Sequence, residues 1–178
     1  MNAAVVYESM FGNTRAIAMA VADGLAEHAD VTTFNVVDAP NRFDAGTRLL
    51  VVGGPTHAFG LSRASTRRSA VDQGALGIDP DRPGLREWLA SLSPTHPELA
   101  VAIFDTRLVK PRWLPGSAAR SAERLLRRLG LARVTPPVSF FVTGVDGPLV
   151  DGEIDRARRW GATLTAQVAT AELDDRRR

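Results

Sequence analysis

The sequence predicts an α/β fold, a doubly wound five-stranded parallel sheet with helices on both faces. Five short apolar runs alternate with segments of helical periodicity. Runs such as Leu49–Val52 and Leu99–Phe104 are apolar at nearly every position, which is typical of strands covered on both faces. Strands separated by helices of this length are joined by right-handed crossovers, so we expect them to run parallel.

The predicted strands are the apolar runs, at Ala3–Tyr7, Val31–Val37, Leu49–Val52, Leu99–Phe104 and Val138–Val142. The predicted helices lie between and after them, at Asn13–Ala26, Arg63–Gln73, Gly84–Leu92, Gly116–Leu129 and Glu153–Leu173. In the first helix, Ile17, Val21 and Leu25 recur every four residues and mark its buried face. In the fourth, Ser117 is placed to cap the amino end.

The length of 178 residues suits one domain, and such a domain buries roughly 70% of the surface of its unfolded chain. No segment is rich enough in Pro, Gly or Ser to act as a linker. We therefore predict a single domain over residues 1–173. Residues 174–178 form a charged tail that we expect to be frayed.

Composition excludes several classes of site. There are no cysteines, which excludes disulfides, thiolate metal sites and cysteine nucleophiles. The three histidines lie on separate segments without ligand spacing, so no metal site is predicted. No apolar stretch reaches the length of a membrane span and no signal peptide is evident, so we expect a cytoplasmic protein that does not enter a membrane. Dispersed arginines and few aromatic residues argue against nucleic-acid binding.

The segment after the first strand has the pattern of an anion-binding turn. An apolar run, a polar turn containing Gly12 and a helix follow one another within residues 5–20. The first N–H groups of a helix have no partner inside the helix, and the helix dipole adds positive potential there. We therefore predict that residues 9–14 bind a phosphate group. The alternative is a turn capped by Asn13 or Thr14 that holds no ligand.

Two further loops open directly after predicted strands. One is residues 53–62, GGPTHAFGLS, and the other begins at Asp105. Ligands of open parallel sheets bind outside the carboxyl ends of the strands, where the strand order reverses. All three loops are therefore expected to converge on one rim of the sheet.

Together the three loops resemble those of the flavodoxin family, FMN-binding electron carriers and related quinone reductases. The first loop matches the family's phosphate pattern, a hydroxyl residue and two variable positions before Gly-Asn-Thr, and GGPTHAFG matches its second flavin loop. The resemblance implies FMN as cofactor, with the phosphate on Ser9, Met10, Phe11, Gly12, Asn13 and Thr14. It implies that the flavin ring lies along Pro55, Thr56, His57, Ala58, Phe59 and Gly60, and beside Asp105, Thr106 and Arg107.

The chain departs from the family pattern in two places. Met10 and Phe11 stand where the family often has hydroxyl residues, so phosphate binding must rely on backbone amides. The Trp and Tyr that sandwich the flavin in well-known carriers have no counterpart, because the only tyrosine is Tyr7 and the third loop has no aromatic residue before Trp113.

Four charged features have two interpretations each. Glu8 is expected to point away from the phosphate or to pair with Arg15 or Arg107, and it receives no catalytic role. His57 either contacts the flavin and shuttles a proton or is a loop residue bonded to backbone. Asp105 and Arg107 border the flavin or form a surface pair. The remaining feature is a helix face that either docks an acidic redox partner or a dinucleotide phosphate, or is simply solvated; its residues are Arg120, Arg124, Arg127 and Arg128.

The leading functional hypothesis is an FMN-binding electron-transfer protein with no assigned catalytic residue, which exchanges electrons with a redox partner protein or with NAD(P)H. A small NAD(P)H-dependent quinone or flavin reductase of the same fold is the first alternative. Such reductases commonly form homodimers, in which the second chain closes the flavin site. The second alternative is a flavodoxin-like module without cofactor that acts in binding.

Overall fold

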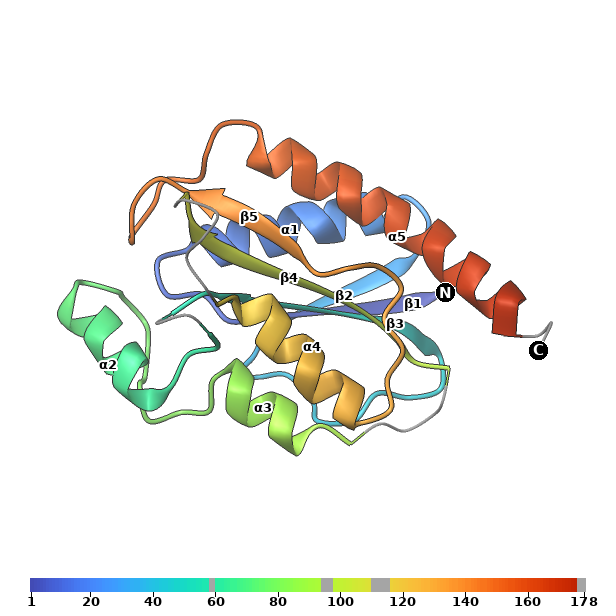
Figure 1. Cartoon of the computed structure of the whole chain (residues 1–178), viewed down its shortest axis with the longest axis horizontal. Coiled ribbons are helices and arrows are strands. Elements are labelled where there is room, and N and C mark those ends of the chain that lie inside the picture. The colour runs from blue at the N-terminus through green and yellow to red at the C-terminus, as the bar shows by residue number, and fades with distance from the viewer. Residues whose placement is uncertain (58–59, 94–97, 110–115, 176–178) are drawn as a thin grey trace.

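A computed structural model gives the fold, and it describes residues 1–57, 60–93, 98–109 and 116–175, with side chains up to residue 170. Five parallel strands form one sheet in the order β2-β1-β3-β4-β5, with helices on both faces (Figure 1). The predicted fold class is therefore confirmed. The strands are β1 (Asn2–Tyr7), β2 (Asp30–Asn35), β3 (Thr47–Pro55), β4 (Ala100–Leu108) and β5 (Val138–Val142). The helices are α1 (Asn13–Leu25), α2 (Ala64–Asp72), α3 (Leu85–Ser91), α4 (Ala118–Arg128) and α5 (Glu153–Asp175).

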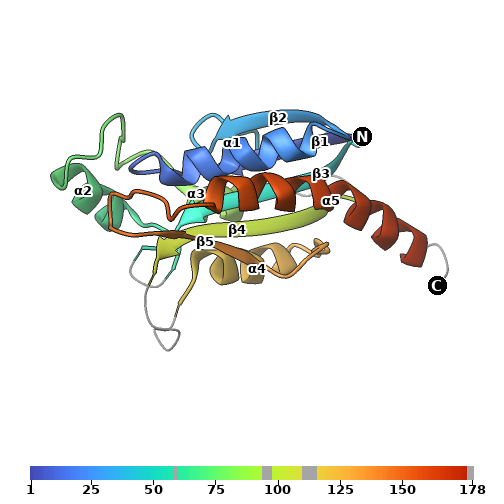
Figure 2. The same ribbon diagram turned by 90° about the horizontal axis from the view of Figure 1, so that it is seen from above.

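Helices α1 and α5 cover one face of the sheet, and α3 and α4 cover the other (Figures 1 and 2). Alternate residues of each central strand serve the two layers. Val5 and Val51 pack beneath α1 and α5, whereas Val6 and Val52 pack beneath α3 and α4. All four side chains are fully buried, which explains why β1 and β3 are continuously apolar in sequence.

Strands β3 and β4 continue beyond their predicted ends. The apolar run of β4 stops at Phe104, but pairing with β3 continues as Gly54 to Asp105 and Pro55 to Thr106. On its other side, β4 pairs with β5 as far as Leu108. Asp105, Thr106 and Arg107 are therefore strand residues rather than the start of a loop. The apolar residues mark only the part of β4 that the core covers, whereas its backbone hydrogen bonding continues beyond that part.

The carboxylate of Asp105 fastens helix α4 to the end of β4. Asp105 is fully buried, and its Oδ2 accepts hydrogen bonds from the Ser117 hydroxyl at 2.5 Å and from the Ala119 N–H at 3.1 Å. The Thr56 hydroxyl donates to the same oxygen at 2.9 Å and accepts from the Ala118 N–H at 2.9 Å. A buried carboxylate thus meets the positive end of a helix dipole, and Ser117 is the predicted N-cap.

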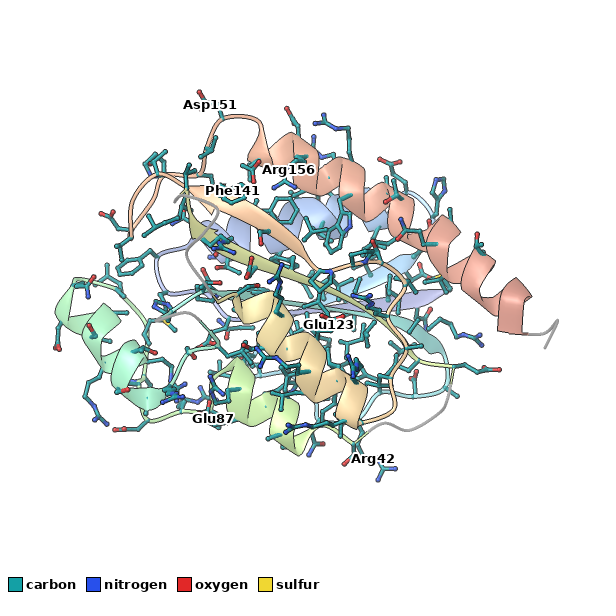
Figure 3. All side chains as sticks on the ribbon, viewed as in Figure 1. Arg42, Glu87, Glu123, Phe141, Asp151 and Arg156 are labelled. Atoms are coloured by element: carbon teal, nitrogen blue, oxygen red, sulfur yellow. The ribbon has the colours of Figure 1, made fainter. Side chains whose placement is uncertain are left out.

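The outer edge of β5 is covered by the first turn of α5. Glu153 accepts a hydrogen bond from the Phe141 N–H at 2.8 Å, and Arg156 donates to the Ser139 carbonyl at 2.5 Å. Figure 3 labels Arg156 in the first turns of α5 and Phe141 on β5. Exposed strand edges pair readily with other chains, so these two side chains block that route along this part of β5.

Helices α1 and α5 cross at two glycines. A Cβ at Gly24 would lie 2.0 Å from the Arg158 carbonyl oxygen, and one at Gly161 would lie 2.2 Å from the Val21 carbonyl oxygen. These neighbours are backbone atoms and cannot rotate away. The two helix backbones therefore approach more closely than any larger residue allows.

We predict that Gly24→Ala and Gly161→Ala each lower the free energy of unfolding by about 3 kcal/mol, because the helices must separate. Chemical denaturation measures the change. Ala166→Ser, on the exposed face of α5, is the control and should leave stability within about 0.5 kcal/mol of wild type. Wild-type stability in both glycine variants would contradict the close crossing.

We also predict that Asp105→Asn lowers the free energy of unfolding by about 1–3 kcal/mol, since an amide loses the charge at the helix terminus and places a buried NH₂ group where Oδ1 has no partner among the described residues. The control is Asp146→Asn, which alters an exposed carboxylate. Equal stability of the two variants would show that the Asp105 interactions are not stabilising.

Candidate cofactor site at the carboxyl ends of the strands

The three loops selected from the sequence leave the sheet at the same end. β1, β3 and β4 are neighbours and run parallel, so residues that follow them emerge side by side. The chain reverses its direction of travel across the sheet between β1 and β3. This is the switch point at which doubly wound sheets bind ligands, and flavodoxin itself is the standard example of this strand order with its flavin there.

The first loop has the backbone geometry of an anion site. Gly12 is the N-cap residue of α1 and has φ 88° and ψ −20°, the left-handed conformation that favours glycine. The Ser9 hydroxyl accepts a hydrogen bond from the Arg15 N–H at 3.2 Å. Within the described part of the chain, none of the N–H groups of residues 9–14 donates a hydrogen bond. Six consecutive donors are thus available in one turn at a helix start.

Met10 and Phe11 have a different task from the hydroxyl residues that they replace. Met10 is 5% exposed and packs against Ala70 and Ala75, and Phe11 and Ile78 lie against the same cluster. The two side chains attach the loop to α2 and the segment after it. They therefore turn away from any ligand, and only their backbone N–H groups remain for phosphate. The apolar pair within a polar turn was the sequence signal for this anchor.

Asn13 and Thr14 connect the first loop to other parts of the rim. Asn13 Nδ2 donates to the Asp146 carbonyl at 2.9 Å. The Thr14 and Thr106 hydroxyls lie 2.6 Å apart, and both residues are buried. Thr14 thus uses its hydroxyl to join β4, leaving its N–H for a ligand. The segment 143–149 is a fourth loop at the site that sequence reasoning missed, although Gly144 and the Gly147–Pro148 pair were a signal for a turn there.

Backbone hydrogen bonds connect residues of the second loop to each other and to β4. His57 and Gly60 exchange two backbone hydrogen bonds of 2.9 Å, and the Thr56 N–H donates to the Thr106 carbonyl at 2.8 Å. Ala58 and Phe59 lie outside the described residues. His57 Nε2 is buried and has no hydrogen-bond partner in the described structure. Burial lowers the pKa of the His57 imidazole, so the neutral ring is favoured and one nitrogen remains available.

For two carboxylates the structure excludes one of the alternatives that the sequence left open. Asp105 does not form a surface pair with Arg107, because its carboxylate is buried against α4. Arg107 is half-buried on β4 and makes no ion pair among the described residues. Glu8 pairs with neither Arg15 nor Arg107; it is buried and accepts hydrogen bonds from the Ser62 hydroxyl and the Leu85 N–H.

The residues present fit a flavin mononucleotide. The free N–H groups of the first loop suit the phosphate, and a Cβ at Gly12 would meet no heavy atom within 4 Å, so the turn is open at that point. The unpartnered His57 nitrogen lies on the neighbouring loop, where a heteroatom of the ring system would complete its hydrogen bonding. Among the described residues no helix is long and apolar enough to cross a membrane, and no three acidic or histidine side chains gather as a metal site.

Several solved structures are similar to this fold. An archaeal flavodoxin has a TM-score of 0.64 at 20% identity, with 95% of this chain and 99% of that chain covered. The flavodoxin of Streptococcus pneumoniae TIGR4 has a TM-score of 0.64 at 18% identity, with 94% and 99% covered. A flavodiiron core from Synechocystis sp. PCC6803 has a TM-score of 0.62 at 16% identity; 96% of this chain is covered, but only 36% of that longer chain.

Identities this low establish a common fold only. No protein with a curated description matches the chain. The family model described as flavodoxin matches residues 5–108, which is more than half of the 178 residues and extends from the second half of β1 to the end of β4, with the first two loops. The chain therefore belongs to the flavodoxin family.

Proposed function

We propose that this protein binds FMN and transfers electrons through it. The observation that carries the proposal is the turn at Gly12, where six consecutive backbone N–H groups without acceptors surround a helix start. A phosphate monoester is dianionic at neutral pH and takes several such donors at once. Family membership supports a flavin, and the position of the turn at the β1–β3 switch supports a mononucleotide.

The neighbouring residues would position the ring system. Pro55, Thr56, His57 and Gly60 would supply backbone groups, His57 its neutral imidazole, and Arg107 a positive charge from β4. When bound, FMN supplies one- and two-electron chemistry. A cation beside the ring stabilises the negative charge that reduction adds, so Arg107 favours the reduced cofactor.

The exposed face of α4 supports exchange of electrons with an acidic redox partner. Arg120 and Arg124 carry no ion pair among the described residues, whereas Glu123 is bound by Arg133. A hollow of about 510 Å³ lies beside them; its lining is Arg120, Glu123, Arg124, Arg133, Pro136 and Pro137. Arg120, in the first turn of α4, lies next to the rim, whereas Arg133 pairs with Val101 near the amino end of β4, so the basic surface extends from the rim along the side of the molecule.

We predict that the purified protein absorbs in the flavin bands after FMN is added, and that Gly12→Val weakens FMN binding on the order of 100-fold, about 3 kcal/mol. A branched side chain would obstruct the close approach of phosphate to the turn. Titration followed by absorbance or flavin fluorescence measures the affinity.

Gly130→Val is the matched control. Gly130 has φ 76°, similar to the 88° of Gly12, and its Cβ position is equally open, but it lies beyond the carboxyl end of α4. Both variants carry similar backbone strain, so only the Gly12 variant should lose FMN. Equal FMN retention by the two would count against the phosphate site, and a wild-type protein that ignores FMN would favour the module without cofactor.

We further predict that a reduced protein partner or dithionite, rather than NADH or NADPH alone, bleaches the bound flavin. The exposed arginines on α4 suit a protein surface, which is why we favour a carrier. Anaerobic titration with each nucleotide tests this directly. Rapid bleaching by NADPH or NADH would instead establish a reductase.

A further inference from the structure

A buried polar network lies directly behind the first loop, and Glu8 is its centre. Glu8 is 4% exposed and immediately precedes Ser9, the first residue of the phosphate turn. Its Oε1 accepts from the Ser62 hydroxyl at 2.6 Å, and its Oε2 accepts from the Leu85 N–H at 3.1 Å. The Glu8 N–H donates to the Gly53 carbonyl, so the carboxylate and the turn are held in one place relative to β3.

Arg67 of α2 completes the network. It is 5% exposed, and its Nη1 lies 3.2 Å from both the Ser62 hydroxyl and Glu87 Oε2. Glu87, at the start of α3 (Figure 3), also accepts from the Gly84 N–H at 2.9 Å. A Cβ at Gly84 would lie 2.5 Å from Arg67 Nη1 and 2.6 Å from Glu8 Oε1. Gly84 thus leaves the space in which the charged groups meet.

The network and the phosphate turn border the same cavity. A cavity of about 50 Å³ is lined by Glu8, Ser9 and Met10 on one side, and by Arg67, Asp79 and Arg82 on the other. Arg82 is already engaged by the Val37 carbonyl at 2.9 Å and lies near Asp38. Glu8 therefore lies beside the first residues of the turn that would hold the phosphate.

Charged groups from α2 and α3 surround Glu8. Arg67 donates to the Ser62 hydroxyl and to Glu87, and Arg86 donates to the Ser62 carbonyl. Asp79 and Arg82 line the cavity beside Glu8, and Arg82 lies near Asp38. Burial raises the pKa of Glu8 even though the Ser62 hydroxyl, the Leu85 N–H and Arg67 oppose this rise.

We propose that Glu8 is a proton-linked determinant of phosphate affinity: the site discriminates FMN from riboflavin more strongly when the Glu8 carboxyl is protonated, and it takes up a proton there as the dianion binds. This inference rests on the proposed FMN function. An ionised carboxylate buried beside a dianion is weakly screened, so each disfavours the other. By linkage the effect is reciprocal, and FMN must favour protonation of Glu8 to the extent that protonation favours FMN.

The experiment compares FMN and riboflavin in wild type and Glu8→Gln across a pH series. Glu8→Gln should bind FMN roughly tenfold more tightly than wild type at alkaline pH. The ratio of the FMN dissociation constant of wild type to that of the variant should fall toward one as the pH drops through the raised pKa of Glu8. Titration of the FMN phosphate cancels in this ratio. For riboflavin, which lacks the phosphate, the ratio should not change with pH.

Glu153→Gln is the control, because Glu153 is a similarly buried carboxylate that lies on α5 against β5. The ratio of the FMN dissociation constants of wild type and Glu153→Gln should not change with pH. Titration of the Glu8 side-chain carbon by ¹³C NMR in wild type needs no variant: its pKa should be higher with FMN than with riboflavin. A pH-independent FMN ratio, or equal Glu8 titration with the two ligands, would overturn the inference while leaving FMN binding intact. Failure of FMN to bind wild type would overturn the proposed function as well.

Discussion

The carboxylate of Asp105 is the interaction on which the shape of the rim depends. It lies at the end of a central strand, where the apolar core stops, and it gathers donors from the second loop and from the amino end of α4. The negative charge is tolerated without an arginine because the helix terminus and two hydroxyls surround one oxygen. Through this one group the positions of β3, β4 and α4 become interdependent.

The rest of the site is built in the same way, by polar side chains that bond to each other rather than to solvent. Thr14 meets Thr106, Asn13 reaches the fourth loop, and Glu8 meets Ser62. These contacts engage side chains of the first loop and leave its backbone N–H groups without acceptors among the described residues. In the proposed function, an anion would be held by these peptide groups, whose directions are fixed by the fold.

The fold class and every strand and helix were predictable, because apolar runs and helical periodicity mark what the core covers. The continuation of β4 through polar residues was not predictable. Asp105, Thr106 and Arg107 belong to β4 because their backbones pair with β3 and β5, and no local sequence pattern reveals that pairing. Gly12 and its neighbours predicted a strand-to-helix turn, and the structure has that turn with Gly12 at the start of α1; its binding of phosphate stays a prediction. The partners of Glu8 were missed because Arg67 and Leu85 approach it only after α2 and α3 fold back over the end of β1.

The close crossing of α1 and α5 has a consequence for the order of assembly. α1 follows the turn at Gly12, and the side of α1 that carries Gly24 packs against α5, the last of the described helices. A nascent chain that has emerged only as far as β5 leaves that side in contact with water until residues 153–175 dock. The helix start at Gly12 is therefore fully supported only late in biogenesis, when this layer of the sheet is complete.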